Sequence, residues 1–204
     1  MSTKILVQAR SSSTRFPGKI YEKIGELSVL EHVFEKCNSV ADTIIIIPYG
    51  DDRLHEYCIS HRMPYFEGPL NDLVGRYYEA ALTFRCDNVV RITSDCPMLD
   101  TPTLEYMISM HEEGKYEFTT NFKTCVDGHD IDIYSMNLLE YLNLTSTERE
   151  HIGLDIKKNI KDYMGSIKIL NYNQLYLKSW FPKLSIDTPA DLEVVRNFYK
   201  ELYA

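Results

Sequence analysis

Long hydrophobic runs, a leader-like N-terminal segment and paired cysteines are all missing from this sequence. The longest apolar run, Ile44 to Ile47, is far too short to span a bilayer, and no segment typical of a signal peptide is present. The cysteines contain no CxxC pair, so they indicate neither a zinc site nor a redox pair; they are Cys37, Cys58, Cys86, Cys96 and Cys125. We therefore expect a cytoplasmic protein without a membrane partner.

Positive charge is also scarce, with 22 lysine and arginine residues against 30 acidic ones and a net charge of −8. This balance argues against general nucleic-acid binding, which depends on a basic face. The first 21 residues are the exception: they carry Lys4, Arg10, Arg15 and Lys19 and no acidic residue. This local reversal of sign leaves open an anionic small molecule as the ligand.

Strand-like and helix-like segments alternate through the first half of the chain. The segment TIIIIP (43–48) is apolar on both faces, which is typical of a parallel strand covered on both sides. Helical apolar spacing is present at 27–40, with Ser28 and Glu31 placed as a capping box, and again at 71–85. We predict a single α/β domain, residues 1–204, with a mostly parallel sheet between helices.

The second half is less regular. YEFTTN (116–121) and DIDIYS (130–135) resemble strands, and we expect them to form a small antiparallel elaboration. Residues 146–161 have apolar residues at helical spacing, with Thr145 and Glu148 placed as a capping box. The chain closes as strand, turn and helix over LSIDTPADLEVVRNFYKELY (184–203), where Thr188 and Asp191 suit the helix cap.

The loop RSSSTRFPGK (10–19) follows the first predicted strand. Ligands of open α/β sheets bind outside the carboxyl ends of the strands, and small residues let backbone N–H groups approach an anion closely. Neither GxxxxGK[ST] nor GxGxxG is present, so the loop is not a P-loop and dinucleotide binding is disfavoured. The alternative is a flexible surface loop with solvated charges.

Two aspartates follow apolar segments. Asp95 ends VVRITSD (89–95) and Asp187 ends LSID (184–187). Carboxylates at one edge of a sheet could hold a hard cation together with phosphate oxygens. Taken singly, each aspartate could equally be a turn or cap residue.

Taken together, these motifs resemble the cytidylyltransferases that make CMP-activated acidic sugars, and within them the spore coat polysaccharide biosynthesis SpsF group. ARSSSTRFPGK (9–19) is similar to the AR-x-x-S-x-R-x-PGK loop of that family. The other matching stretches, in order, are GPLNDLVGRYYEA (68–80), RITSDCP (91–97), REH (149–151) and DTPADL (187–192). Gln8 and Ser94 stand where the ketodeoxyoctonate enzymes have proline and glycine, which puts ketodeoxyoctonate itself in doubt as the substrate.

The resemblance implies a Rossmann-like fold of the nucleotide-diphospho-sugar transferase type, and transfer of CMP from CTP to a sugar hydroxyl with release of pyrophosphate. It implies a catalytic role for Arg10, Arg15, Lys19 and Asp95, and Mg²⁺ held by Asp95 and Asp187. The nucleotide-binding residues it implies are Gln8, Ala9, Arg10, Ser11, Ser12, Arg15, Lys19, Arg76, Thr93 and Ser94. Arg76 could instead be a surface helix residue.

We expect the acceptor side of the site to come from about residues 115–180. A sugar carboxylate or hydroxyl would meet Asp127, Gly128, His129, Asp130, Asp132, Arg149 and His151, although turn and cap roles for this region carry equal weight. The expected partners are CTP and a small acidic sugar, and analogy alone suggests a homodimer. The alternatives are a glycosyltransferase using the D-x-D of residues 130–132, or a nucleotide-binding protein without catalysis.

Overall fold

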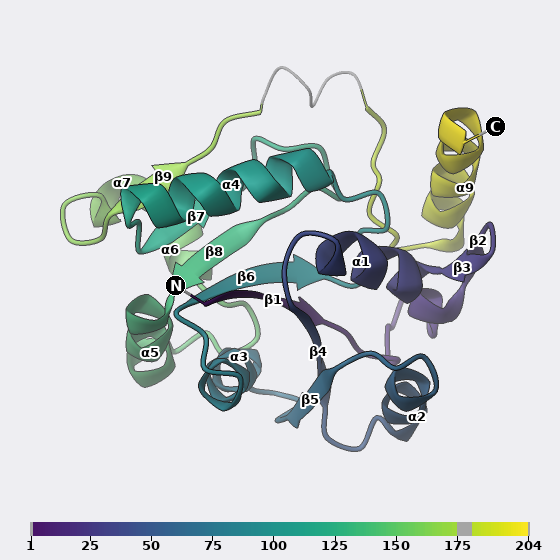
Figure 1. Ribbon diagram of the computed structural model, residues 1–204, viewed down its shortest axis with the longest axis horizontal. Coiled ribbons are helices and arrows are strands. Elements are labelled where there is room, and N and C mark those ends of the chain that lie inside the picture. The colour runs from purple at the N-terminus through teal and green to yellow at the C-terminus, as the bar shows by residue number, and fades with distance from the viewer. Residues whose placement is uncertain (1, 175–180, 204) are drawn as a thin grey trace.

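The computed structural model describes residues 2–174 and 181–203 (Figure 1). Its strands are β1 (Thr3–Gln8), β2 (Lys23–Ile24), β3 (Leu27–Ser28), β4 (Thr43–Pro48), β5 (Tyr65–Gly68), β6 (Asn88–Thr93), β7 (Phe118–Thr120), β8 (Asp132–Ser135) and β9 (Ile169–Asn171). Its helices are the short 3₁₀ helix η1 (Lys19–Tyr21), α1 (Val29–Asn38), α2 (Asp52–Ser60), α3 (Leu73–Thr83), α4 (Thr101–Gly114), α5 (Met136–Thr145), α6 (Leu154–Lys158), α7 (Ile160–Tyr163) and α9 (Pro189–Tyr203).

Seven strands form one sheet in the order β5-β4-β1-β6-β8-β7-β9, and β2 and β3 form a separate hairpin-like pair. The four strands β5, β4, β1 and β6 are parallel, whereas β8 runs antiparallel to both β6 and β7. The predicted α/β class and the antiparallel elaboration are therefore confirmed. The carboxyl ends of β1 and β6 lie side by side at the centre of the sheet, where an α/β ligand site is expected.

Helices cover both faces of the sheet, as Figure 1 shows, with α1 and α4 on one side and α3 and α5 on the other. Alternate residues of β1 divide between the two cores: Ile5 and Val7 pack with α1, α2 and α4, and Leu6 packs with α3, α5 and α6. A third cluster joins α9 to β2 and to the segment around Leu184. No helix of the described part of the chain is long and apolar enough to cross a bilayer.

The predicted helix caps at 28–31 and 188–191 are both present. The Ser28 side chain accepts from Glu31 N while the Glu31 carboxylate accepts from Ser28 N. At the start of α9 the Asp191 carboxylate accepts from Thr188 N at 2.8 Å, and the Thr188 hydroxyl accepts from Asp191 N at 3.2 Å. Each pair satisfies backbone donors that a helix start would otherwise leave open.

Two predicted elements differ. The helix expected over 146–161 is only α6 and α7, and Thr145 is the last residue of α5 rather than a cap. Gly153, at φ 64°, and Asn159, at φ −123°, interrupt the helical path that the apolar spacing suggested. The segment LSID is not a strand; Ile186 N donates to Asp95 O, just beyond the end of β6, at 2.9 Å.

Candidate active site

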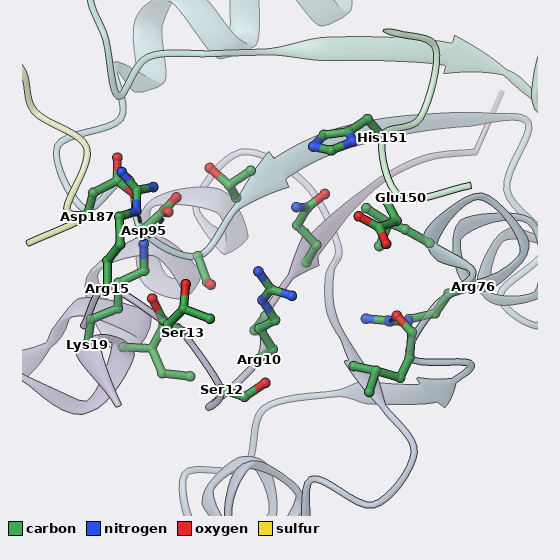
Figure 2. Close-up of a pocket in the computed structure, with 18 of the residues that line it drawn as sticks. Arg10, Ser12, Ser13, Arg15, Lys19, Arg76, Asp95, Glu150, His151 and Asp187 are labelled. Carbon is green, nitrogen blue, oxygen red and sulfur yellow. Dashed lines mark hydrogen bonds and ion pairs between the residues drawn. The ribbon is translucent and has the colours of Figure 1, made fainter. Parts of the chain in front are cut away.

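A cavity of about 410 Å³ lies at the carboxyl ends of β1 and β6. The predicted site residues that line it are Gln8, Ala9, Arg10, Ser12, Arg15, Lys19, Arg76, Thr93, Ser94, Asp95, His151 and Asp187. Figure 2 shows Asp95, Asp187, Arg15 and Lys19 at one end and Arg76 and Glu150 at the other, with Arg10 between them. The cavity therefore has a carboxylate–cation end and a second end shared by α3 and the α5–α6 segment.

Asp95 and Asp187 are 92 positions apart in the sequence, yet one lysine contacts both. Lys19 Nζ lies 2.7 Å from an oxygen of Asp95 and 3.4 Å from an oxygen of Asp187. The backbone bond from Ile186 to Asp95 sets the two segments side by side. Arg15 adds a second cation at 2.7 Å from the same Asp187 oxygen. Loop 10–19, the end of β6 and the segment before α9 thus meet at one point.

Lys183 is a functional-site neighbour that the sequence reasoning missed. Its Nζ lies 2.8 Å from Asp187 and 3.1 Å from Asp191. Burial alone would raise the pKa of Asp187, but Lys183, Lys19 and Arg15 outweigh it and lower that pKa below its usual range. The i, i+4 spacing of Lys183 and Asp187 was the available signal, although it is usual for helices and this segment is not helical.

The donor set suits a hard cation that is completed by a substrate. Because Asp95 and Asp187 converge on one ammonium group, their oxygens are close enough to share a small ion in its place. Within residues 2–174 and 181–203 no group of three or more His, Cys, Asp or Glu residues could hold a metal alone. Mg²⁺ normally takes one or two carboxylates with phosphate oxygens and water, so this pair fits it.

The N–H groups of the basic loop divide into two sets. Ser11 N donates to the Asp51 carboxylate at 2.7 Å, so Ser11 turns away from the cavity and does not line it. Ser13 N and Gly18 N both donate to Ser11 O. The described residues offer no partner to the N–H groups of Arg10, Ser12, Thr14 and Arg15, all of which line the cavity. Of the predicted nucleotide contacts in this loop, Ser11 is therefore the one that anchors the loop instead.

Arg76 is not a surface residue, because it is only 4% exposed. Its guanidinium donates to Pro69 O and Leu70 O at 2.6–3.0 Å, which fixes the loop between β5 and α3. Burial lowers its pKa relative to the ordinary arginine value. Arg76 thus shapes the wall of the cavity as well as lining it.

The predicted acceptor residue Arg149 lies outside the cavity. Its guanidinium binds both oxygens of Asp72 at 2.9 Å and both the backbone and side-chain oxygens of Asn143 at 2.8 Å. Asp72 also accepts from Gly75 N as the cap of α3. Four of the five guanidinium donors of Arg149 are used in this way, so the residue fastens α3 to the end of α5.

The other predicted acceptor residues divide in the same way. Asp132 is 3% exposed and pairs with Arg91 and Lys157 beneath the cavity. Asp130 accepts weakly from Gly128 N, and burial raises its pKa. Neither aspartate lines the cavity, so the structure does not support them as direct acceptor contacts. His151 does line the cavity, and Glu150, which the sequence reasoning did not single out, lies beside it.

Residues 127–129 pack against the segment before α9 rather than facing the cavity. Asp127 O accepts from Leu184 N at 2.8 Å. Gly128 has φ 104°, and a Cβ atom there would lie 2.6 Å from the backbone of Leu184. The ring of His129 lies 6.5 Å from that of Phe181. The glycine thus permits a close contact that positions the Asp187 segment, and none of the three residues lines the cavity.

Comparison with known proteins decides the family. The model of the cytidylyltransferase family matches residues 4–199. The chain belongs to this family. The chain is also 25% identical to the spore coat polysaccharide biosynthesis protein SpsF of Bacillus subtilis, over 96% of this chain and 85% of that protein. It is 32% identical to the 3-deoxy-manno-octulosonate cytidylyltransferase of Solibacter usitatus, over 98% and 96% of the two chains.

Solved structures agree with the fold of this cytidylyltransferase. A cytidylyltransferase from Leptospira borgpetersenii is 29% identical, with a TM-score of 0.77 over 100% of this chain and 96% of that one. A CMP:2-keto-3-deoxy-manno-octonic acid synthetase complexed with CTP has a TM-score of 0.74 at 18% identity, over 99% and 100% of the two chains. Membership of the cytidylyltransferase family makes the protein a nucleotidyltransferase.

Proposed function

We propose that this cytidylyltransferase transfers CMP from CTP to a hydroxyl of an acidic, nonulosonic-type sugar, for surface polysaccharide or glycan synthesis. The observation that carries the proposal is the meeting of Asp95 and Asp187 with Lys19 and Arg15 at one end of a cavity. Two carboxylates and two cations match a triphosphate with its Mg²⁺. Relatives named as cytidylyltransferases of 3-deoxy-manno-octulosonate support the class of acceptor.

In this mechanism the acceptor oxygen bonds to the α-phosphorus of CTP. The bond from that phosphorus to the bridging oxygen breaks, pyrophosphate leaves, and the hydroxyl proton passes to solvent. Asp95 and Asp187 would hold Mg²⁺, which supplies Lewis-acid stabilisation of the phosphate charge. Lys19 and Arg15 neutralise the departing pyrophosphate, and the open N–H groups of loop 10–15 orient the phosphates.

The nucleotide occupies the part of the cavity at the carboxyl ends of β1 and β6, where it meets Gln8, Ala9, Thr93 and Ser94. Residues from about 115 to 180 supply the acceptor side of the single domain 1–204, with His151 and Glu150 in contact with the cavity. The D-x-D of a glycosyltransferase receives no support from the geometry, because Asp130 and Asp132 do not line the cavity. A cytoplasmic location and a homodimer stay predictions.

Pyrophosphate release tests the proposal. The purified protein is assayed with Mg²⁺, each of the four nucleoside triphosphates, and a panel of carboxylated and phosphorylated sugars. We expect release with CTP and a carboxylated sugar. Release with another triphosphate would refute the choice of base. Absence of CTP binding in a thermal-shift control would refute the nucleotide site itself.

A further inference from the structure

Arg91 lies in the cavity wall; it is the first residue of the matching stretch RITSDCP (91–97), but neither that match nor the family comparison gave it a role. Its place follows from the strand register: Leu6 of β1, Arg91 of β6 and Asp132 of β8 are aligned neighbours. Paired residues of adjacent strands point to the same face, and here that face is covered by α3, α5 and α6. Arg91 is therefore a charged residue in a mostly apolar layer, and it lies next to the cavity.

Buried partners hold Arg91 in one orientation. Its Nη1 lies 3.1 Å from an Asp132 oxygen, and its Nε donates to Gln8 Oε1 at 3.2 Å. Asp132 also contacts Lys157 Nζ at 2.8 Å, so one carboxylate faces two basic groups. Burial alone would lower the pKa of Arg91, but Asp132 more than offsets it and raises that pKa, so the guanidinium stays charged.

The remaining donors of Arg91 are free to meet a ligand. Among residues 2–174 and 181–203, Nη2 of Arg91 has no hydrogen-bond partner, and the side chain is 16% exposed. Gln8 holds Arg91 from the nucleotide side of the cavity, because an arginine Nε–H can only donate and so fixes the Gln8 oxygen toward Arg91. Tyr77 OH lies 3.2 Å from the same Gln8 oxygen. The Gln8 amide nitrogen is then left for the cavity.

We infer that Arg91 binds the carboxylate of the acceptor sugar and sets the preference for acidic acceptors, an inference that rests on the proposed function. A planar, fixed guanidinium matches a carboxylate in a two-point contact. The other lining cations have different positions: Arg15 and Lys19 are at the Asp95–Asp187 end, and Arg76 holds loop carbonyls. Arg10 lines the cavity but is exposed, and none of the residues that the structure describes holds its guanidinium.

The second half of the chain supports this assignment. Asp132, which pairs with Arg91, lies in β8, and Lys157, which pairs with the same carboxylate, lies in α6; both elements are within the part of the chain that we assign to the acceptor. Arg149, which the sequence suggested as a carboxylate ligand, is instead bound to Asp72 and Asn143. Arg91 thus contacts the acceptor half of the chain through Asp132 and also lines the cavity.

The test compares two matched acceptors in a pyrophosphate-release assay with CTP and Mg²⁺. One is 3-deoxy-manno-octulosonate or N-acetylneuraminate, and the other is the same sugar with its carboxylate reduced to an alcohol. We expect the wild type to use the acid and to discriminate against the alcohol. Arg91→Gln should raise the KM for the acid roughly 10- to 100-fold and remove most of the discrimination, with the KM for CTP within about twofold of wild type.

Two further variants are tested: Arg91→Lys is the conservative replacement, and Arg85→Lys is the control. Arg91→Lys keeps the charge beside Asp132, which protects the fold, but lacks the planar fork, so we expect an intermediate loss. Arg85 is exposed at the end of α3 and lies outside the cavity, and its variant should match wild type. The inference is overturned if Arg91→Gln keeps the preference for the acid, if the KM for CTP rises equally, or if the wild type binds CTP but uses only uncharged sugars. Absence of CTP binding by the wild type would overturn the proposed function itself.

Discussion

Among the residues that the structure describes, Lys19 has three oxygen partners: Asp95, Asp187 and the backbone oxygen of Ile186. In the proposed mechanism, the pyrophosphate part of CTP binds this ammonium group in place of these oxygens. Lys19→Ala should therefore weaken CTP binding about tenfold or more and leave CMP binding nearly unchanged, as measured by calorimetric titration of both nucleotides. Lys23→Ala, a nearby exposed lysine, is the control. Equal losses for CTP and CMP would mean that Lys19 does not meet the pyrophosphate.

Asp51 acts on the nucleotide loop from outside the cavity. One of its oxygens caps α2 at Leu54 N, and the other accepts from Ser11 N. Asp51→Ser keeps a capping oxygen but cannot reach both groups, so the N–H groups beside Ser11 lose their fixed direction. We expect a KM for CTP raised several-fold with the thermal unfolding midpoint almost unchanged. Asp52→Ser, at the exposed neighbour, should leave both unchanged, and a normal KM in Asp51→Ser would contradict this role.

At the scale of single residues, the sequence placed Asp95, Asp187, Arg15 and Lys19 in one site, because apolar segments that end in aspartate and a basic loop form a recognisable pattern. The structure brings these four side chains together, and their roles stay predictions. It could not predict Asp51 or Arg91, whose roles depend on which strands become neighbours. The sequence did not reveal that Arg149 pairs with Asp72 outside the cavity, because the two residues are 77 positions apart and no local spacing indicates such a pair.

Helix α3 depends on one ion pair at its start. Asp72 caps the helix, and Arg149 holds Asp72 against Asn143 at the end of α5. Arg149→Gln removes these contacts. We expect its free energy of unfolding, measured by urea denaturation, to be about 1–2 kcal/mol lower than that of the wild type. Arg85→Gln, at an exposed arginine just beyond the other end of α3, serves as the control for loss of an arginine side chain. Unchanged stability with a raised KM for the acceptor would instead favour the acceptor role that the sequence suggested.

At the scale of elements, the capping signals at Ser28–Glu31 and Thr188–Asp191 predicted helix starts correctly, because such contacts are local. The predicted helix 146–161 failed for a physical reason. Ile152 and Ile156 are buried as the spacing indicated, but they are buried from an irregular turn and a short helix. Apolar spacing reports which side chains face the core and does not require a continuous helix between them.

The stability of the whole molecule should fall in two steps as the pH decreases. His111 is buried between Thr119 and Asn88, and burial lowers its pKa to about 4 from 6.5. The unfolded chain then binds a proton that the folded chain does not, so stability present above pH 6.5 is lost as the pH falls toward 4, by about 3 kcal/mol. Urea denaturation across this range measures the loss, and His111→Gln should flatten it. An equally steep loss in the variant would assign the step to other groups.

A second step lies at lower pH. Burial would raise the pKa of Glu31, but hydrogen bonds from Ser28 bring it down to about 2. The stabilisation from this capping carboxylate is present above about pH 4.5 and is lost as the pH falls toward 2.

Alternation of strands and helices predicted the parallel sheet of the whole molecule. The order of β8, β7 and β9, with β9 parallel to β7, followed only from the structure, because neither pairing leaves a local spacing signal.

The central claim is that Asp95 and Asp187 hold the metal for transfer of CMP from CTP. The most direct measurement is the rate of pyrophosphate release against Mg²⁺ concentration for wild type, Asp95→Asn and Asp187→Asn, with the thermal unfolding midpoint measured in parallel. The account predicts Mg²⁺-dependent release by the wild type and at least a hundredfold loss in each folded variant, because an amide is a poor ligand for this ion. Full activity in both variants would contradict it.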